Sequence, residues 1–141
     1  MTSKKNVLIS AYESKKIPSS FTVVLYNDIE TIEKETVEEL FLLDLLDYFK
    51  DSEVVEVLSE ILSKVCVGGK IHIQSMDIDQ FCLYFSSRIL DFNEKNILYS
   101  GQKNIQSMTS LLNIIDKNFQ CEVLAKKYIN GYEYYILLEK K

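Results

Sequence analysis

The segment ELFLLDLLDYFKDSEVVEVLSEILSKVCVGGKIHIQ, residues 39–74, decides the fold. It opens with an apolar run at residues 39–43, which Asp44 ends and which could be a strand or a helix by periodicity alone. A clear amphipathic helix follows, capped by Asp51 or Ser52. Its apolar residues recur at helical spacing on one stripe: Val54, Val57, Leu58, Ile61, Leu62 and Val65.

Two glycines separate this helix from the next element. Gly68-Gly69 is expected to end the helix, because a helix commonly finishes on a glycine in the left-handed conformation. Residues 70–74 then alternate between polar and apolar side chains, which is typical of a strand. The segment therefore predicts a crossover from one strand through a helix to a second strand.

Strands are also predicted on both sides of this segment. Residues 7–9 and 21–26 read as strands, and Ser107 or Thr109 can cap a helix that runs to residue 117. A hairpin is expected over 121–127 and 132–139, because Asn130-Gly131 is a strong tight-turn signal. The order predicts an α/β fold, with a mainly parallel sheet, helices on its faces and an antiparallel final pair.

Length and composition restrict the class of protein. The chain has 141 residues, which predicts one domain over residues 1–141. Its net charge of −5 and pI near 4.9 make nucleic acid an unlikely partner. Three separated cysteines indicate a reduced, cytoplasmic protein, and no apolar run is long enough for a membrane helix. Abundant lysine, isoleucine and asparagine fit an AT-rich genome, including that of a virus or phage.

Few residues suggest catalysis by themselves. His72 is the single histidine, and we interpret it as structural because it has no second histidine beside it. Acids follow the predicted strands, where ligands bind in parallel sheets: Asp28, Asp44, Asp47, Asp77 and Asp79. Asp77 or Asp79 could equally cap a helix, and two acids without a third ligand do not define a metal site.

The middle of the chain resembles class I S-adenosylmethionine-dependent methyltransferases. Residues 43–49, Leu-Asp-Leu-Leu-Asp-Tyr-Phe, resemble the family's segment after its fourth strand, and residues 65–73 resemble its "LKPGG" turn into the fifth strand. The likeness covers residues 20–141 in outline. It implies a small Rossmann-like three-layer sandwich with strand order 2-1-4-5-7-6.

The sequence departs from this family at the cofactor turn. The family's first strand ends in a glycine-rich turn, where this chain has Ser10-Ala11-Tyr12-Glu13. Only about ten residues separate the first two predicted strands, too few for the family's usual helix. Two hypotheses stay open: a degenerate, non-catalytic interaction or structural module with no cofactor expected, and a small active methyltransferase acting on a small molecule, glycan or protein.

The resemblance also suggests site residues for the active alternative. Asp28 would hold the cofactor's ribose, and the methionine end would be lined by Ser10, Tyr12, Asp44 and Leu45. The methyl acceptor would face Asp77, Tyr99 and Gln102. In the non-catalytic hypothesis, a protein partner or a second copy of the chain is the expected ligand, and no membrane is involved.

Overall fold

The computed structural model describes residues 5–10, 21–86, 107–129 and 131–141. Its strands are β1 (Lys5–Ser10), β2 (Thr22–Leu25), β3 (Val37–Leu43), β4 (Val65–Met76), β5 (Cys121–Ile129) and β6 (Glu133–Lys140). Its α-helices are α1 (Asp51–Lys64), α2 (Ile78–Ser86) and α4 (Met108–Asn118). Two short 3₁₀ helices are η1 (Tyr26–Thr31) and η2 (Leu46–Tyr48).

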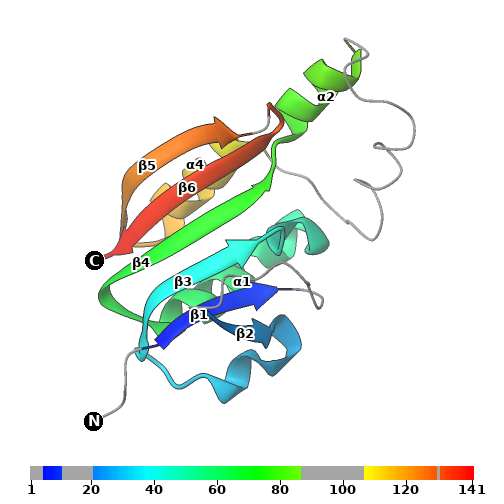
Figure 1. Cartoon of the computed structure of the whole chain (residues 1–141). Coiled ribbons are helices and arrows are strands. Elements are labelled where there is room, and N and C mark those ends of the chain that lie inside the picture. The colour runs from blue at the N-terminus through cyan, green and yellow to red at the C-terminus, as the bar shows by residue number, and fades with distance from the viewer. Residues whose placement is uncertain (1–4, 11–20, 87–106, 130) are drawn as a thin grey trace.

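The strands form one mixed sheet in the order β2-β1-β3-β4-β6-β5 (Figure 1). The pairs β1–β2, β1–β3 and β3–β4 are parallel, whereas β4–β6 and β5–β6 are antiparallel. When β3 and β4 stand for the family's fourth and fifth strands, this is the predicted order 2-1-4-5-7-6. The mostly parallel sheet with an antiparallel C-terminal hairpin is thus confirmed.

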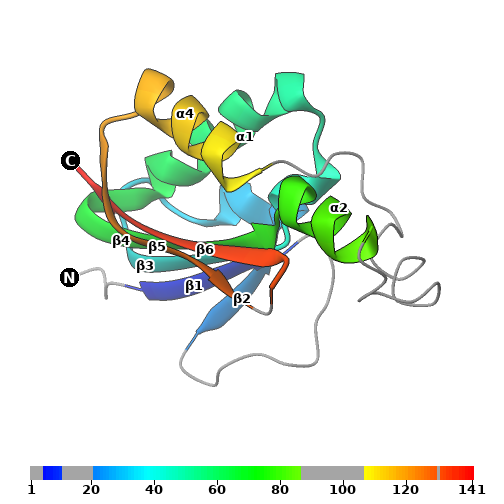
Figure 2. The same cartoon turned by 90° about the horizontal axis from the view of Figure 1, so that it is seen from above.

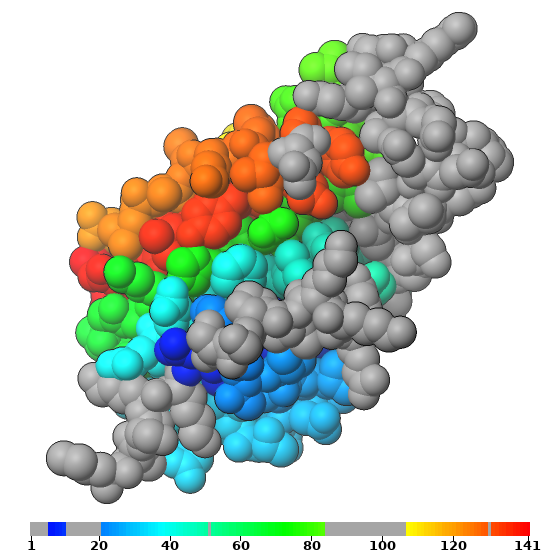
Figure 3. All heavy atoms as spheres, viewed as in Figure 1, coloured from blue at the N-terminus to red at the C-terminus, as the bar shows by residue number. Residues whose placement is uncertain are grey.

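Both α1 and α4 pack on the same face of the sheet (Figure 2). Between them and the sheet lies the main core, which includes Val54, Ile61 and Leu111 from the helices and Leu42, Ile73 and Ile136 from the strands. Fully burying one such aliphatic side chain is worth about 1.5–3 kcal/mol. Among the described residues, no helix covers the opposite face, which Figure 3 shows from the front.

The prediction for Gly68-Gly69 was wrong. The helix α1 ends at Lys64, and both glycines lie inside β4. Pairing with β3 jumps from Val37–Val65 to Glu39–Lys70, so the glycines belong to a bulge in β4. Gly68 has a φ of +82°, and a Cβ on Gly69 would lie 2.8 Å from the carbonyl oxygen of Cys66. Glycine is therefore required at these two positions by the bulge in β4 and not by the end of a helix.

The helix starts also differ in part from expectation. Neither Asp51 nor Ser52 caps α1; the backbone of Lys50 occupies that position, and its N–H donates to Glu53 Oε2 at 3.0 Å. Ser107 caps α4 as predicted, because its Oγ accepts from the N–H of Ser110 at 3.1 Å. No helix in the described part of the chain combines the length and apolar character needed to cross a membrane.

Candidate functional site

The carboxyl ends of the parallel strands are where the sequence predicted a site. Ser10 ends β1 beside Leu25 of β2, and its side chain is buried at 3% exposure. Leu45, which follows β3, is buried at 1% exposure. Two of the predicted cofactor contacts are therefore enclosed by the protein itself.

Asp28 differs from these two because it is exposed. It lies in η1, three residues beyond the end of β2. The hydroxyl of Thr31 donates to its backbone oxygen at 2.6 Å, which stabilises the 3₁₀ turn. Of the predicted cofactor residues that the structure describes, Asp28 is the one that is exposed.

Asp44 lies directly after β3 in a left-handed conformation, with a φ of 52°. Aspartate adopts this conformation more readily than most residues. Its N–H donates to the carbonyl of Gln74 at 2.8 Å, which extends the pairing of β3 with β4 by one residue. Burial, followed by the nearby charge of Glu133, raises the pKa of the Asp44 carboxyl to about 6.

Asp47 is more deeply enclosed than Asp44. It lies in η2 with 2% exposure, and burial raises the pKa of its carboxyl to about 7. The neighbouring Ser75 hydroxyl and Met76 backbone partly oppose this rise, and the charge of Asp44 adds to it. The Oδ2 of Asp47 and the Oγ of Ser75 are buried without a hydrogen-bond partner. A carboxyl in this environment holds its proton close to neutral pH.

Tyr134 of β6 completes this buried group. Its side chain is 1% exposed, and burial, with Asp47 as the next contributor, raises the pKa of its phenol. In the sequence, Asp47 is one of several acids after strands, and no local pattern indicates its grouping with Ser75 and Tyr134. Alternation along β4 and β6 could have placed these two on the core side, beside Ile73 and Ile136.

Asp77 caps helices. Its Oδ1 accepts from the N–H of Gln80 at 3.0 Å, and its Oδ2 accepts from the N–H of Met108 at 2.8 Å. With 0% exposure, this carboxylate joins the first turn of α2 to the start of α4. These contacts confirm the helix-cap interpretation of Asp77, and its role toward a methyl acceptor stays a prediction. Three other predicted residues, Tyr12, Tyr99 and Gln102, lie outside the described residues.

His72 lies on the sheet face away from α1 and α4, in a polar network. Its Nε2 lies 2.7 Å from Glu39 Oε1, and its Nδ1 lies 2.6 Å from the Tyr135 hydroxyl. Because a carboxylate only accepts, Nε2 is the donor to Glu39, and the Tyr135 hydroxyl is the hydrogen-bond partner of Nδ1. The ring also stacks on Phe41, with centroids 5.2 Å apart. These contacts agree with a structural role.

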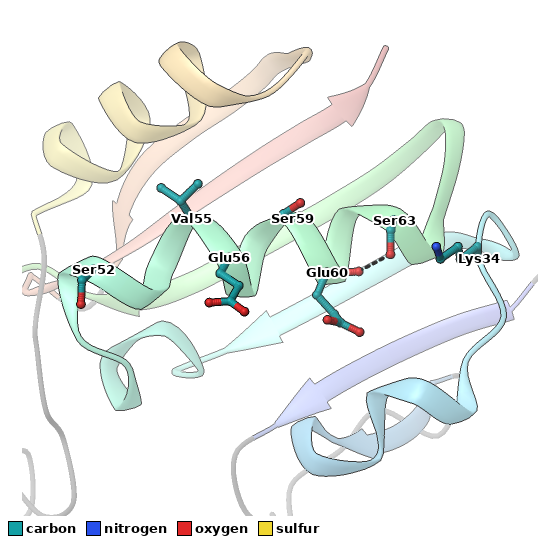
Figure 4. Close-up of a pocket in the computed structure, with 7 residues that line it drawn as sticks. All are labelled: Lys34, Ser52, Val55, Glu56, Ser59, Glu60 and Ser63. Atoms are coloured by element: carbon teal, nitrogen blue, oxygen red, sulfur yellow. Dashed lines mark hydrogen bonds between the residues drawn. The ribbon is translucent and has the colours of Figure 1, made fainter.

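Two cavities stand out among the described residues, and neither lies at the carboxyl ends of the strands. The larger, about 620 Å³, follows the outer stripe of α1 (Figure 4) and is lined by Lys34, Ser52, Val55, Glu56, Ser59, Glu60 and Ser63. The smaller, about 300 Å³, lies beside the β4 bulge, lined in part by Glu39, Gly68 and Lys70. The predicted cofactor edge is thus a different region from both cavities.

Solved structures establish what kind of fold this is. The PH0226 protein from Pyrococcus horikoshii OT3 superposes with a TM-score of 0.67 at 15% identity, over 96% of this chain and 72% of that one. A SAM-dependent methyltransferase from Archaeoglobus fulgidus gives 0.58 at 14% identity, over 85% and 68%. The chain has the fold of a class I methyltransferase. Magnesium protoporphyrin IX methyltransferase from Synechocystis PCC 6803, with bound SAH, gives 0.57 at 12% identity, over 86% and 52%.

Sequence comparison adds one relative, which is not named as a methyltransferase. No family model matches the chain. It is 28% identical over 113 residues to ankyrin repeat protein A of Escherichia coli (strain K12). That alignment covers 79% of this chain but 15% of the E. coli protein, so the methyltransferase-like chain spans a small part of that relative's length.

Proposed function

We propose that the chain is a degenerate methyltransferase-like domain that acts as a non-catalytic interaction or structural module. The observation that carries this proposal is the end of β1. All four glycines follow residue 67, so the turn after β1 contains none. A cofactor that approaches the backbone closely needs glycine there, since side chains fill the space and resist the required conformation.

The burial of side chains at the same edge supports this proposal. Ser10 and Leu45, two of the four neighbours expected for the cofactor's methionine end, are enclosed. Farther along, Asp47, Ser75 and Tyr134 fill the ends of η2, β4 and β6 with the chain's own side chains. The residues present therefore fit S-adenosylmethionine poorly.

The E. coli relative is consistent with a module in a larger protein. A segment like this one occupies 15% of a chain that is named for ankyrin repeats. Such repeats stack into extended surfaces that bind other proteins. A methyltransferase-like segment in such a chain would likewise serve binding without chemistry of its own.

The active alternative rests on Asp28. This exposed acid follows β2, the position at which an acid holds a ribose hydroxyl in related sheets. With it, the chain would be a small S-adenosylmethionine-dependent methyltransferase acting on a small molecule, glycan or protein. Its fold is shared with enzymes that use this cofactor.

Calorimetric titration with S-adenosylmethionine and S-adenosylhomocysteine separates the two functions. The proposal expects no binding heat and no thermal stabilisation by either ligand at about 1 mM. Micromolar binding that Asp28→Ala abolishes would contradict it and establish the alternative. Glu30→Ala is the matched control, because Glu30 is an exposed acid in the same 3₁₀ helix.

A further inference from the structure

The strand β5 forms a long exposed edge of the sheet. It ends the strand order on the side of β6, and along it Val123 and Leu124 are each 42% exposed and Tyr128 is 45% exposed. It has nine residues, whereas β2 at the opposite edge has four. In Figure 3, β5 borders the face that lies away from α1 and α4. Such an edge presents backbone groups that can pair with another strand.

A bulge determines which side chains of β5 share a face. Pairing with β6 passes from Val123–Leu138 to Ala125–Leu137, so Leu124 is an extra residue. Glu122 pairs with Glu139, and Lys127 pairs with Tyr135. Because directly paired residues lie on one face of a sheet, Glu122 and Lys127 both lie on the face away from the helices.

The opposite side of β5 follows in the same way. Val123 and Lys126 pair with Leu138 and Ile136, which point into the core beneath α1 and α4. The extra residue thus places Glu122 and Lys127, five positions apart, on one face. In a strand without a bulge, residues at an odd separation lie on opposite faces.

We propose that two copies of this chain dimerise by antiparallel pairing of their β5 strands about a two-fold axis between Leu124 and Ala125. This register sets Glu122 of one copy opposite Lys127 of the other, twice, and Val123 opposite Lys126, twice. It keeps the faces matched for residues 121–123 against residues 126–128, because the extra residue Leu124 of each copy stands opposite Ala125 of the other, beside the axis. The dimer concerns a surface separate from the cofactor edge and does not rest on the proposed function.

The charges of β5 favour the second copy over other strands. Lysines and bulges on an edge strand discourage indiscriminate pairing. Here Lys127 meets Glu122 when the partner is the same strand in this register, and that acid then lies between Lys127 of the other copy and Lys141 of its own, whose Nζ is 2.7 Å from Glu122 Oε2. If the axis passed through Lys127, that lysine would face itself, and like charges directly opposite are unfavourable.

Charge reversal tests the register. Sedimentation equilibrium on the whole chain over a concentration series measures the dimer dissociation constant. We expect Glu122→Lys and Lys127→Glu each to raise that constant by about tenfold or more, and the double reversal to restore dimerisation. Lys126→Glu is the matched control, because it makes the same charge change on the other face, opposite Val123. Combined with Glu122→Lys, it should not restore dimerisation.

Two results would overturn the proposed dimer. A monomer at every concentration up to about 1 mM would overturn the proposal. A dimer that neither single reversal weakens, or that the double reversal fails to restore, would place the contact elsewhere and overturn it as well. Hydrogen exchange of the β5 amides provides a second readout, with protection expected to rise as the chain concentration rises. Thermal melts of each variant confirm that it is folded.

Discussion

Asp47 is the residue whose environment departs most from that of a surface acid. Its carboxyl is 2% exposed, has a pKa of about 7 and leaves Oδ2 without a hydrogen-bond partner. The folded state binds a proton at this site more tightly than the unfolded chain does. Stability from this group is therefore complete below about pH 4 and is lost as the pH rises through about 7.

Asp47→Asn should consequently stabilise the protein, most strongly above pH 7. A shift of about 3 pKa units corresponds to at most about 4 kcal/mol at pH 8, with little difference at pH 4. Urea unfolding at pH 4 and at pH 8 measures this change in the free energy of unfolding. Asp116→Asn on the exposed side of α4 is the matched control. An equal effect of Asp47→Asn at both pH values would show that the carboxyl does not titrate in this range.

Burial explains why the candidate site could be predicted only in part. The sequence placed Ser10, Asp44 and Leu45 correctly at the ends of strands, because strand ends follow from local patterns. It could not show that Ser10 and Leu45 are enclosed, since enclosure depends on segments far apart in the chain. Asp77 or Asp79 was a candidate helix cap, but the bond of Asp77 to Met108, 31 residues away, has no local signal.

At the scale of elements, the bulge in β4 is the feature that sequence patterns misjudged. A helix end and a strand bulge both use glycine in the left-handed conformation, so Gly68-Gly69 fits either. The strand order, by contrast, was predicted through the resemblance to class I methyltransferases. The strand–helix–strand pattern of residues 39–74 and the Asn130-Gly131 turn indicated only a mainly parallel sheet with an antiparallel final pair.

Replacing each glycine with alanine separates two requirements of the bulge: a positive φ at residue 68 and the close packing at residue 69. Gly68→Ala should cost about 1 kcal/mol, because its φ is +82° but nothing lies within 4 Å of the added Cβ. Gly69→Ala should cost more, about 2–3 kcal/mol, because the Cβ would meet Val65 Cγ1 at 2.5 Å and the Cys66 carbonyl at 2.8 Å. The midpoints of denaturant unfolding of the two variants show which substitution costs more stability. If Gly68→Ala costs more, backbone conformation rather than space governs the bulge.

At the scale of the molecule, Asp77 connects parts of the chain that are distant in sequence. Asp77→Ala removes an acceptor from Gln80 and from Met108, and the buried N–H of Met108 then has no acceptor from that side chain. We expect a loss of about 2–4 kcal/mol in the free energy of unfolding. Asp79→Ala, at an exposed acid in the first turn of α2, is the control. Equal stability of both variants would refute a bridging role.

The place of β6 in the sheet has a consequence for synthesis on the ribosome. This strand lies between β4 and β5, yet it is the last of the six to be translated. Until it emerges, Ile71 and Ile73 of β4 lack their neighbours Leu138 and Ile136, and β5 has no strand to pair with. The nascent chain therefore carries an open hydrophobic sheet edge from the synthesis of β4 until that of β6, which is the stage at which chaperones would be most needed.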